Sequence, residues 1–484
     1  MCAKLGVSCD FVETARPRPE TLGTYRALRH FDDFYAGVFG DVWPSVRLAL
    51  LCPNKSCAVP NTLSPNASDV EKQLRSLGTL SLRNLWERRA LAATSATDEN
   101  DKPAVSLELA EPHEHATTAG SETTAGEGES FDESSRYIPA SDVSTPLMSF
   151  VPSSRLVYQE EQIDESSYRG FFKPDPEVQL PIKRWPVGKE NIFPGKLDAA
   201  MFPTGDVSTF PPPRRCGKER LFDYYLMDGA SVLPVLALDL QQGDELADLC
   251  ACSWRKAAGS YVHGTHRKAE KKGSLEQLIK RLITTTPLPV DKLTLMMGLI
   301  VRGSAVACDA SSSRVKRLRE VLQGYLPVKQ LQKGSVLHKN LLAPGFTAQQ
   351  SFDKILLDVP CTNDRLSVAE DDNNWFSQKR LQERLKLPQQ QMDMLCKALA
   401  MLRPGGSLVY STCSLSPIQN DGVVHMALQQ FRHTSAQYVI VDLSEAFASL
   451  PFRFFGGCRY GQLSLPYLPS NVGPLYVARI ERVC

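Results

Sequence analysis

Apolar runs with the length of buried β-strands alternate with helical segments through the second half of this 484-residue chain. A strand that is apolar at every position must be covered on both faces, as happens when helices connect parallel strands. The sequence therefore predicts an α/β fold built on a doubly wound, mostly parallel sheet. The expected strands are 245–251, 304–309, a weak one around Val336, 354–359, 407–413, 438–443 and a closing antiparallel strand at 475–482; the expected helices between them are 312–326, 388–402 and 419–431.

Composition divides the remainder of the chain. Residues 24–51 and 66–92 have helical patterns, and 224–238 is expected to be a further helix. Between Thr97 and Glu165 there are sixteen Asp or Glu residues and three Lys or Arg residues, which leaves too little apolar surface for a core. We expect a helical N-terminal extension at 1–96, a disordered acidic linker rich in Ser, Pro and Gly at 97–199, and the α/β domain at 200–484.

Charge and cysteine usage exclude several classes of protein. The net charge of +1 gives no overall polyelectrolyte signal, so any nucleic-acid binding must come from local basic patches. No apolar run approaches the length of a membrane span. The thirteen cysteines are scattered in a way that is typical of a reducing compartment. Neither Cys52 with Cys57 nor Cys250 with Cys252 has a second pair at zinc spacing, so no metal site is expected.

The first thirty residues carry mixed targeting features. They lack the apolar segment of a secretory signal. Arginines at 16, 18, 26 and 29 favour a mitochondrial presequence, whereas acidic residues at 10, 13 and 20 oppose it.

Polar and nucleophilic residues lie at the ends of the predicted parallel strands, where open α/β sheets bind their ligands. Asp248 and Asp309 end the first two strands, and Asp358 to Cys361 and Cys413 end the fourth and fifth. Adjacent strands lie roughly 5 Å apart, which places the two cysteines on one rim. One strand-end cysteine is more typical of a small buried hydrophobe, but two at neighbouring strand ends favour a reactive pair.

The sequences around these cysteines resemble a known family. Asp358-Val359-Pro360-Cys361-Thr362-Asn363-Asp364-Arg365 and 410–421 resemble the two signature motifs of the Sun-type (NOL/NOP/Sun) RNA 5-methylcytosine methyltransferases. Residues 39–47, 224–228 and 471–476 resemble the subgroup that methylates mitochondrial small-subunit ribosomal RNA and pairs with a mitochondrial termination-factor-type helical-repeat protein. The resemblance covers 24–51 and 200–484. It implies a Rossmann-like fold, S-adenosylmethionine as cofactor, methylation of cytosine C5 in RNA, and a role in ribosome biogenesis in the mitochondrial matrix.

The resemblance also assigns roles to single residues. It implies that Cys413 is the thiolate that attacks the base, that Cys361 assists release of the enzyme–base adduct, and that Asp358 holds the cytosine edge. Adding a thiolate to C6 makes C5 able to accept a methyl group, which is covalent catalysis. The cofactor-binding residues that it implies are Asp248, Cys250, Lys256, Asp309, Arg314 and Asp358.

One motif departs from the family pattern. Residues 248–256 read Asp-Leu-Cys-Ala-Cys-Ser-Trp-Arg-Lys, so Trp254 and Arg255 stand where the family has two glycines. A basic insertion follows, over 252–292. It is a retained intron or gene-model error, an isoform that has lost cofactor binding, or a basic segment that contacts RNA. A catalytically inactive scaffold that binds RNA or a partner is therefore the alternative function. The third strand also lacks the acid that usually contacts adenine.

A second chemistry uses the same cysteine. His425 lies one helix after Cys413, which raises the possibility of a Cys/His hydrolase. No third orienting partner and no oxyanion-hole motif accompany the pair. We therefore expect His425 on the surface of its helix.

Overall fold

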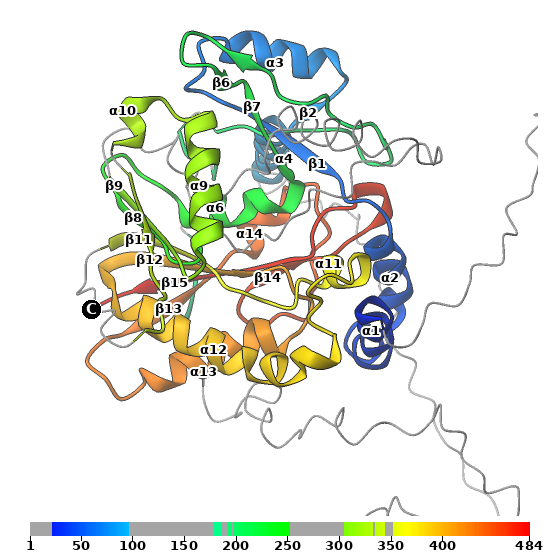
Figure 1. Ribbon diagram of the computed structural model, residues 1–484, viewed down its shortest axis with the longest axis vertical. Helices are drawn as coiled ribbons and strands as arrows, with labels where there is room; N and C mark the ends of the chain where they lie inside the picture. The colour runs from blue at the N-terminus through cyan, green and yellow to red at the C-terminus, as the bar shows by residue number, and fades with distance from the viewer. Residues whose placement is uncertain are drawn as a thin grey trace, which may run out of the picture. The chain divides into compact units, whose positions relative to one another are not determined.

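A central sheet with the strand order β10-β9-β8-β11-β12-β15-β13-β3 organises the computed structural model, and β14 pairs with β15 (Figure 1). The first five strands in this order are parallel, and β15 runs antiparallel to both β12 and β13. The doubly wound, mostly parallel α/β fold is confirmed. The strands are β3 Ile182–Arg184, β8 Glu245–Asp248, β9 Ser304–Asp309, β10 Gly334–His338, β11 Phe352–Asp358, β12 Leu402–Thr412, β13 Tyr438–Asp442, β14 Gln462–Ser464 and β15 Leu475–Arg482.

The structure describes residues 22–95, 179–185, 192–195, 197–251, 304–332, 334–343 and 352–484. These residues, except 93–95, belong to one unit formed by Met1–Ala92 and Asp164–Cys484. The acidic stretch 97–165, the insertion 252–292 and Lys256 lie outside the described residues. The division of the chain at 96 and 199 stays a prediction.

Helices cover both faces of the sheet (Figure 1). One face packs against α6, α9 and α14, and the other against α1, α2, α12 and α13. The sheet residues alternate accordingly: Leu356 and Val409 join the first core, Ile355 and Leu408 the second, and all four are 0% exposed. The helices are α1 Gly23–Phe39, α2 Trp43–Leu51, α3 Ala67–Ser76, α4 Leu82–Ser95, α6 Leu233–Leu238, α9 Ser312–Tyr325, α10 Val328–Leu331, α11 Asp364–Ala369, α12 Leu381–Ala400, α13 Val423–Gln430 and α14 Ser444–Ala448.

A second, antiparallel sheet joins the N-terminal segment to the α/β region. Its order is β2-β4-β1-β7, with the strands β1 Ser56–Pro60, β2 Leu80–Ser81, β4 Ala200–Met201 and β7 Tyr224–Asp228. The expected helix at 224–238 is therefore wrong over its first five residues, because they pair along their whole length with β1. That partner lies far away in sequence. The remaining small strands are the hairpin β5 Arg215–Cys216 and β6 Leu221–Phe222.

The prediction of disorder for 97–199 is wrong at its C-terminal end. Residues 182–184 form β3 and pair with β13. Trp185, Ile192, Phe193 and Leu197 are buried in the core on the α6 side of the sheet. These residues supply the apolar surface that the acidic composition of 97–165 lacks.

Two helix boundaries also differ from expectation. The pattern at 66–92 is two helices, because the chain turns at Gly78, where φ is +83°. Helix α12 begins at Leu381, and Pro388 lies inside it. Among the described helices, none has both the length and the apolar character that crossing a membrane requires.

Candidate active site

The two cysteines of the strand-end motifs lie side by side. Cys361 follows β11 and Cys413 follows β12, and these strands pair in parallel with Asp358 opposite Ser411. The two Sγ atoms are 3.5 Å apart, and the backbone N–H of Cys413 donates to Sγ of Cys361 at 3.3 Å. Cys361 is 6% exposed and Cys413 is partly buried. The structure thus brings the two thiols to a single rim.

Asp358 is the last residue of β11 and lies three residues before Cys361. Its Oδ1 accepts a hydrogen bond of 2.8 Å from the hydroxyl of Ser411, and the residue is 7% exposed. The register between β11 and β12 fixes this contact. A nearly buried carboxylate beside two thiols can orient a polar ligand and favour positive charge on it.

Two glutamines hold the turn that carries Cys361, and sequence reasoning missed both. Nε2 of Gln391, on α12, donates to the carbonyl of Pro360 at 2.7 Å. Gln419 accepts from the N–H of Thr362 at 3.2 Å and donates to its hydroxyl at 3.1 Å. Both are buried. Their role depends on contacts across tens of residues, so no local pattern marks it.

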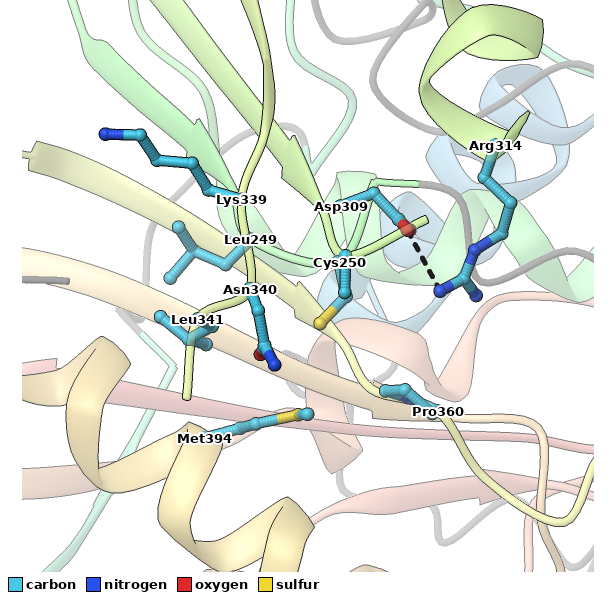
Figure 2. Close-up of a pocket in the computed structure, with 10 residues that line it drawn as sticks. Leu249, Cys250, Asp309, Arg314, Lys339, Asn340, Leu341, Pro360 and Met394 are labelled. Atoms are coloured by element: carbon cyan, nitrogen blue, oxygen red, sulfur yellow. Dashed lines mark ion pairs between the residues drawn. The ribbon is translucent and has the colours of Figure 1, made fainter. Parts of the chain in front are cut away.

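A pocket adjoins this turn, with about 330 Å³ of empty space that includes solvent at its open side (Figure 2). It shares Pro360 with the Asp358–Cys361 turn, so a molecule bound in it can contact that turn. Its lining combines apolar and charged groups: Leu249, Cys250, Asp309, Ala310, Arg314, Lys339, Asn340, Leu341, Pro360 and Met394.

Asp309 and Arg314 form an ion pair at one side of the pocket (Figure 2). Nη2 of Arg314 is 2.9 Å from Oδ1 of Asp309, and the N–H of Ser311 donates to the same oxygen at 2.7 Å. Asp309 ends β9, and Ser311 caps α9 by accepting from the N–H of Arg314. The strand end and the helix cap together fix the carboxylate.

The end of β8 supplies two more of the predicted cofactor residues. Asp248 is 1% exposed and is not part of the pocket lining. Cys250 is in the lining, and its sulfur points into the pocket (Figure 2). Burial, with a smaller effect of neighbouring Cys308 and Asp248, raises the pKa of the Cys250 thiol well above its usual value. Cys250 is therefore a neutral wall residue and not a nucleophile.

Lys339 and Asn340 follow β10 and also line the pocket. Oδ1 of Asn340 accepts from the N–H of Leu342 at 2.9 Å, which orients its amide group toward Met394 (Figure 2). The sequence analysis considered only an acidic residue within 335–339. It did not single out the amide of Asn340, one residue later. The signal that would have found it is a side chain with hydrogen-bonding capacity directly after the third parallel strand.

His425 is not on the helix surface, so that expectation is wrong. It is 1% exposed, and its Nδ1 lies 2.7 Å from the hydroxyl of Tyr460, against which the ring stacks. The helix turns this face toward the loop before β14. The Nδ1 of His425 therefore has a structural partner in Tyr460, which no local sequence pattern links to it.

Comparisons with known proteins found a matching family model, similar curated proteins and similar solved structures. The family model described as 16S rRNA methyltransferase RsmB/F matches residues 281–478. The 5-cytosine rRNA methyltransferase nsun-4 of Caenorhabditis elegans is 30% identical, with 97% of this chain and 94% of that protein covered. The mitochondrial tRNA (cytosine(34)-C(5))-methyltransferase of Danio rerio is 30% identical, with 54% of this chain and 62% of that protein covered. A solved structure, NSun6 from Pyrococcus horikoshii with SFG, has a TM-score of 0.42 and 17% identity, covering 96% of this chain and 98% of that one.

Proposed function

Since the chain belongs to the RsmB/F-type family of S-adenosylmethionine-dependent RNA cytosine-C5 methyltransferases, we propose that it methylates a cytosine of mitochondrial small-subunit ribosomal RNA during ribosome biogenesis. The observation that carries the reaction is the pair of thiols at 3.5 Å beside the buried Asp358. Two thiols and a carboxylate at one rim match a reaction that forms a covalent base adduct and then breaks it.

In this proposal Cys413 is the nucleophile. Its thiolate adds to C6 of cytosine, which makes C5 electron-rich enough to take a methyl group. Loss of the C5 proton and cleavage of the Sγ–C6 bond then return the thiolate. Cys361, at 3.5 Å from Cys413, is close enough to assist that release. Asp358 accepts a hydrogen bond from the amino edge of the base, which orients the base. The hydroxyl of Ser411 also donates to Oδ1 of Asp358.

The residues of the pocket fit the methyl donor. Asp309 offers a fixed carboxylate for ribose hydroxyls, Asn340 offers an amide for the adenine edge, and Met394 with Leu341 offers apolar contact. When bound there, S-adenosylmethionine supplies the methyl group. Since the pocket shares Pro360 with the cysteine turn, donor and base meet over the same residues. Lys256, which is also expected to bind the cofactor, lies outside the described part of the chain.

The nearly buried position of Cys361 favours a base that leaves its stack. A flipped or unpaired cytosine reaches such a rim at the lowest cost, so single-stranded or loop RNA is the expected substrate. The mitochondrial assignment, in the matrix, is supported by the subgroup motifs and by the name of the Danio rerio relative. The net charge of +1 fits a chain that gains RNA affinity from a helical-repeat partner.

Covalent trapping tests the two cysteine roles. A Cys361→Ala variant, given S-adenosylmethionine and ribosomal RNA, should accumulate an RNA adduct that survives denaturing gels. The Cys413→Ala variant should form none, and the double variant serves as its control. An adduct that persists in the double variant would contradict the assignment.

Binding of labelled S-adenosylmethionine to the full chain separates the enzyme from the inactive scaffold. Saturable binding with methyl transfer supports the enzyme. RNA binding without binding of the methyl donor would refute the proposed activity and establish the scaffold, whose sequence basis is Trp254 and Arg255 in place of glycines.

A further inference from the structure

A third carboxylate, Asp364, joins the loops that carry the two cysteines. It is 0% exposed and lies three residues after Cys361. Its oxygens accept from the hydroxyl of Thr362 at 2.5 Å and from the N–H of Leu415 at 2.7 Å. The hydroxyl of Ser414 lies 3.2 Å from Oδ2. In the opposite direction, the N–H of Asp364 donates to the carbonyl of Cys413 at 3.2 Å. Asp364 therefore links the loop after Cys361 to the loop around Cys413.

The donors around Asp364 match a carboxylate that only accepts. Burial raises the pKa of Asp364, whereas the hydrogen bonds from Thr362, Leu415, Tyr35 and Ser414 oppose that rise. Replacing one oxygen by an NH₂ group would set donor against donor at this site. The network therefore depends on the carboxylate and not merely on a group of its size.

The fourth donor comes from the N-terminal helix. The hydroxyl of Tyr35, on α1, donates to Oδ2 of Asp364 at 2.7 Å. Burial, reinforced by Asp364, raises the pKa of Tyr35 well above its usual value, so the hydroxyl keeps its proton. The rings of Phe31, Phe39 and Trp43 surround Tyr35 and fix its direction. Helix α1 thereby reaches the cysteine loops from a part of the sequence that shares no motif with them.

We propose that Asp364 is a positioning residue that sets the separation of the Cys361 and Cys413 thiols, and that Tyr35 couples α1 to this function. Asp364 contacts neither sulfur and reacts with nothing. It acts by linking the backbone after Cys361 to the backbone around Cys413. Reacting groups misplaced by about 1 Å can lose about 100-fold in rate, so a link of this kind has catalytic value. This role rests on the proposed function, because the separation of the thiols matters only if they react with a base. The test does not depend on that function, since it measures the two thiols directly.

The test measures thiol geometry directly. Dibromobimane alkylates two nearby thiols, with loss of two bromides, and yields a bridged Cys361–Cys413 peptide that mass spectrometry detects after digestion. The assay uses the full chain and needs neither RNA nor S-adenosylmethionine. Asp364→Asn should lower the rate of bridging at least about tenfold, and Tyr35→Phe should lower it by a smaller factor, since it removes one donor of four.

Asp421→Asn is the matched control. Asp421 is a partly buried carboxylate that also accepts from a tyrosine hydroxyl, that of Tyr476, and from backbone N–H groups, but these belong to 459–461 and not to the cysteine loops. Its bridging rate should stay within about twofold of wild type. Circular dichroism verifies that each variant is folded. If Asp364→Asn does not fold, Tyr35→Phe takes its place in the test.

Three results would overturn the proposal: unchanged bridging in folded Asp364→Asn, unchanged bridging in Tyr35→Phe when Asp364→Asn does not fold, or an equal loss in Asp421→Asn. If methyl transfer is measurable, Asp364→Asn should lower kcat while KM for RNA stays within twofold. A chain that never methylates would contradict the proposed function, and the bridging result would still decide the role of Asp364.

Discussion

Arg365 is the residue whose replacement the structure predicts most sharply. Its guanidinium group donates to four acceptors on two segments of the chain, 49–52 and 471–473. Nε donates to the carbonyl of Gly473 at 2.7 Å, Nη1 to the carbonyls of Ala49 and Cys52 at 2.9 and 2.8 Å, and Nη2 to Oδ1 of Asn471 at 2.8 Å. Burial lowers the pKa of Arg365 to about 10, so the group stays charged near neutral pH.

Arg365→Lys keeps the charge but replaces three nitrogens with one. A single ammonium group can replace only one of these three nitrogens. Even if it replaces Nη1, which makes two of the four hydrogen bonds, the bonds of Nε and Nη2 are lost. A hydrogen bond to a charged group contributes about 1.5–3 kcal/mol, and water recovers part of the loss. We expect the free energy of unfolding to fall by about 2–4 kcal/mol.

Urea unfolding followed by far-UV circular dichroism measures this change as a lower midpoint with an unchanged slope. The control is Arg403→Lys, because Arg403 is 40% exposed and makes a surface ion pair with Asp353 at 2.9 Å. Its loss should stay below about 1 kcal/mol. A loss below about 0.5 kcal/mol for Arg365→Lys, or equal losses for both variants, would refute the reasoning.

Two further changes test the titration of the partly buried His30 and the proposed cofactor pocket. Burial, with a smaller effect of Arg384, lowers the pKa of His30 to about 3, so below pH 6.5 the unfolded chain binds more protons and stability falls as the pH falls. His30→Gln should reduce the dependence of the free energy of unfolding on pH by up to about 1.4 kcal/mol per pH unit between pH 6.5 and 4.5. Urea titrations at several pH values measure this slope, and equal slopes for the wild type and the variant would contradict the prediction. Asp309→Asn should weaken S-adenosylmethionine binding about tenfold in calorimetry, because a charge-assisted hydrogen bond becomes a neutral one. An unchanged dissociation constant would show that Asp309 does not hold the ribose.

The central strands β11, β12 and β15 were predictable because they are buried on both faces. The bounds of β9 and β15 agree with the prediction, and Cys361 and Cys413 lie at neighbouring strand ends as expected. Continuous apolar runs leave few other ways to bury their residues, and the parallel arrangement places their ends together.

Two of the misses share one physical cause, which is a partner distant in sequence. Residues 224–228 form a strand because β1 pairs with them, and Asp364 became a site residue because Tyr35 reaches it. Pro388 is tolerated within α12 although its ring removes a backbone donor, so a helix start placed at that proline was too late. Local pattern does not report such contacts.

The pairing of β1 with β7 bears on how the polypeptide is held together. Trp86 donates to the carbonyl of Ala446, Arg365 binds the carbonyls that end α2, and Tyr35 binds Asp364, so the residues before 95 contact the C-terminal half at several places. A cut in the backbone between 95 and 179 would leave all of these contacts in place. The two fragments should therefore stay together as a non-covalent complex, and separately expressed pieces should reassemble into one catalytic unit, with association entropy as the added cost.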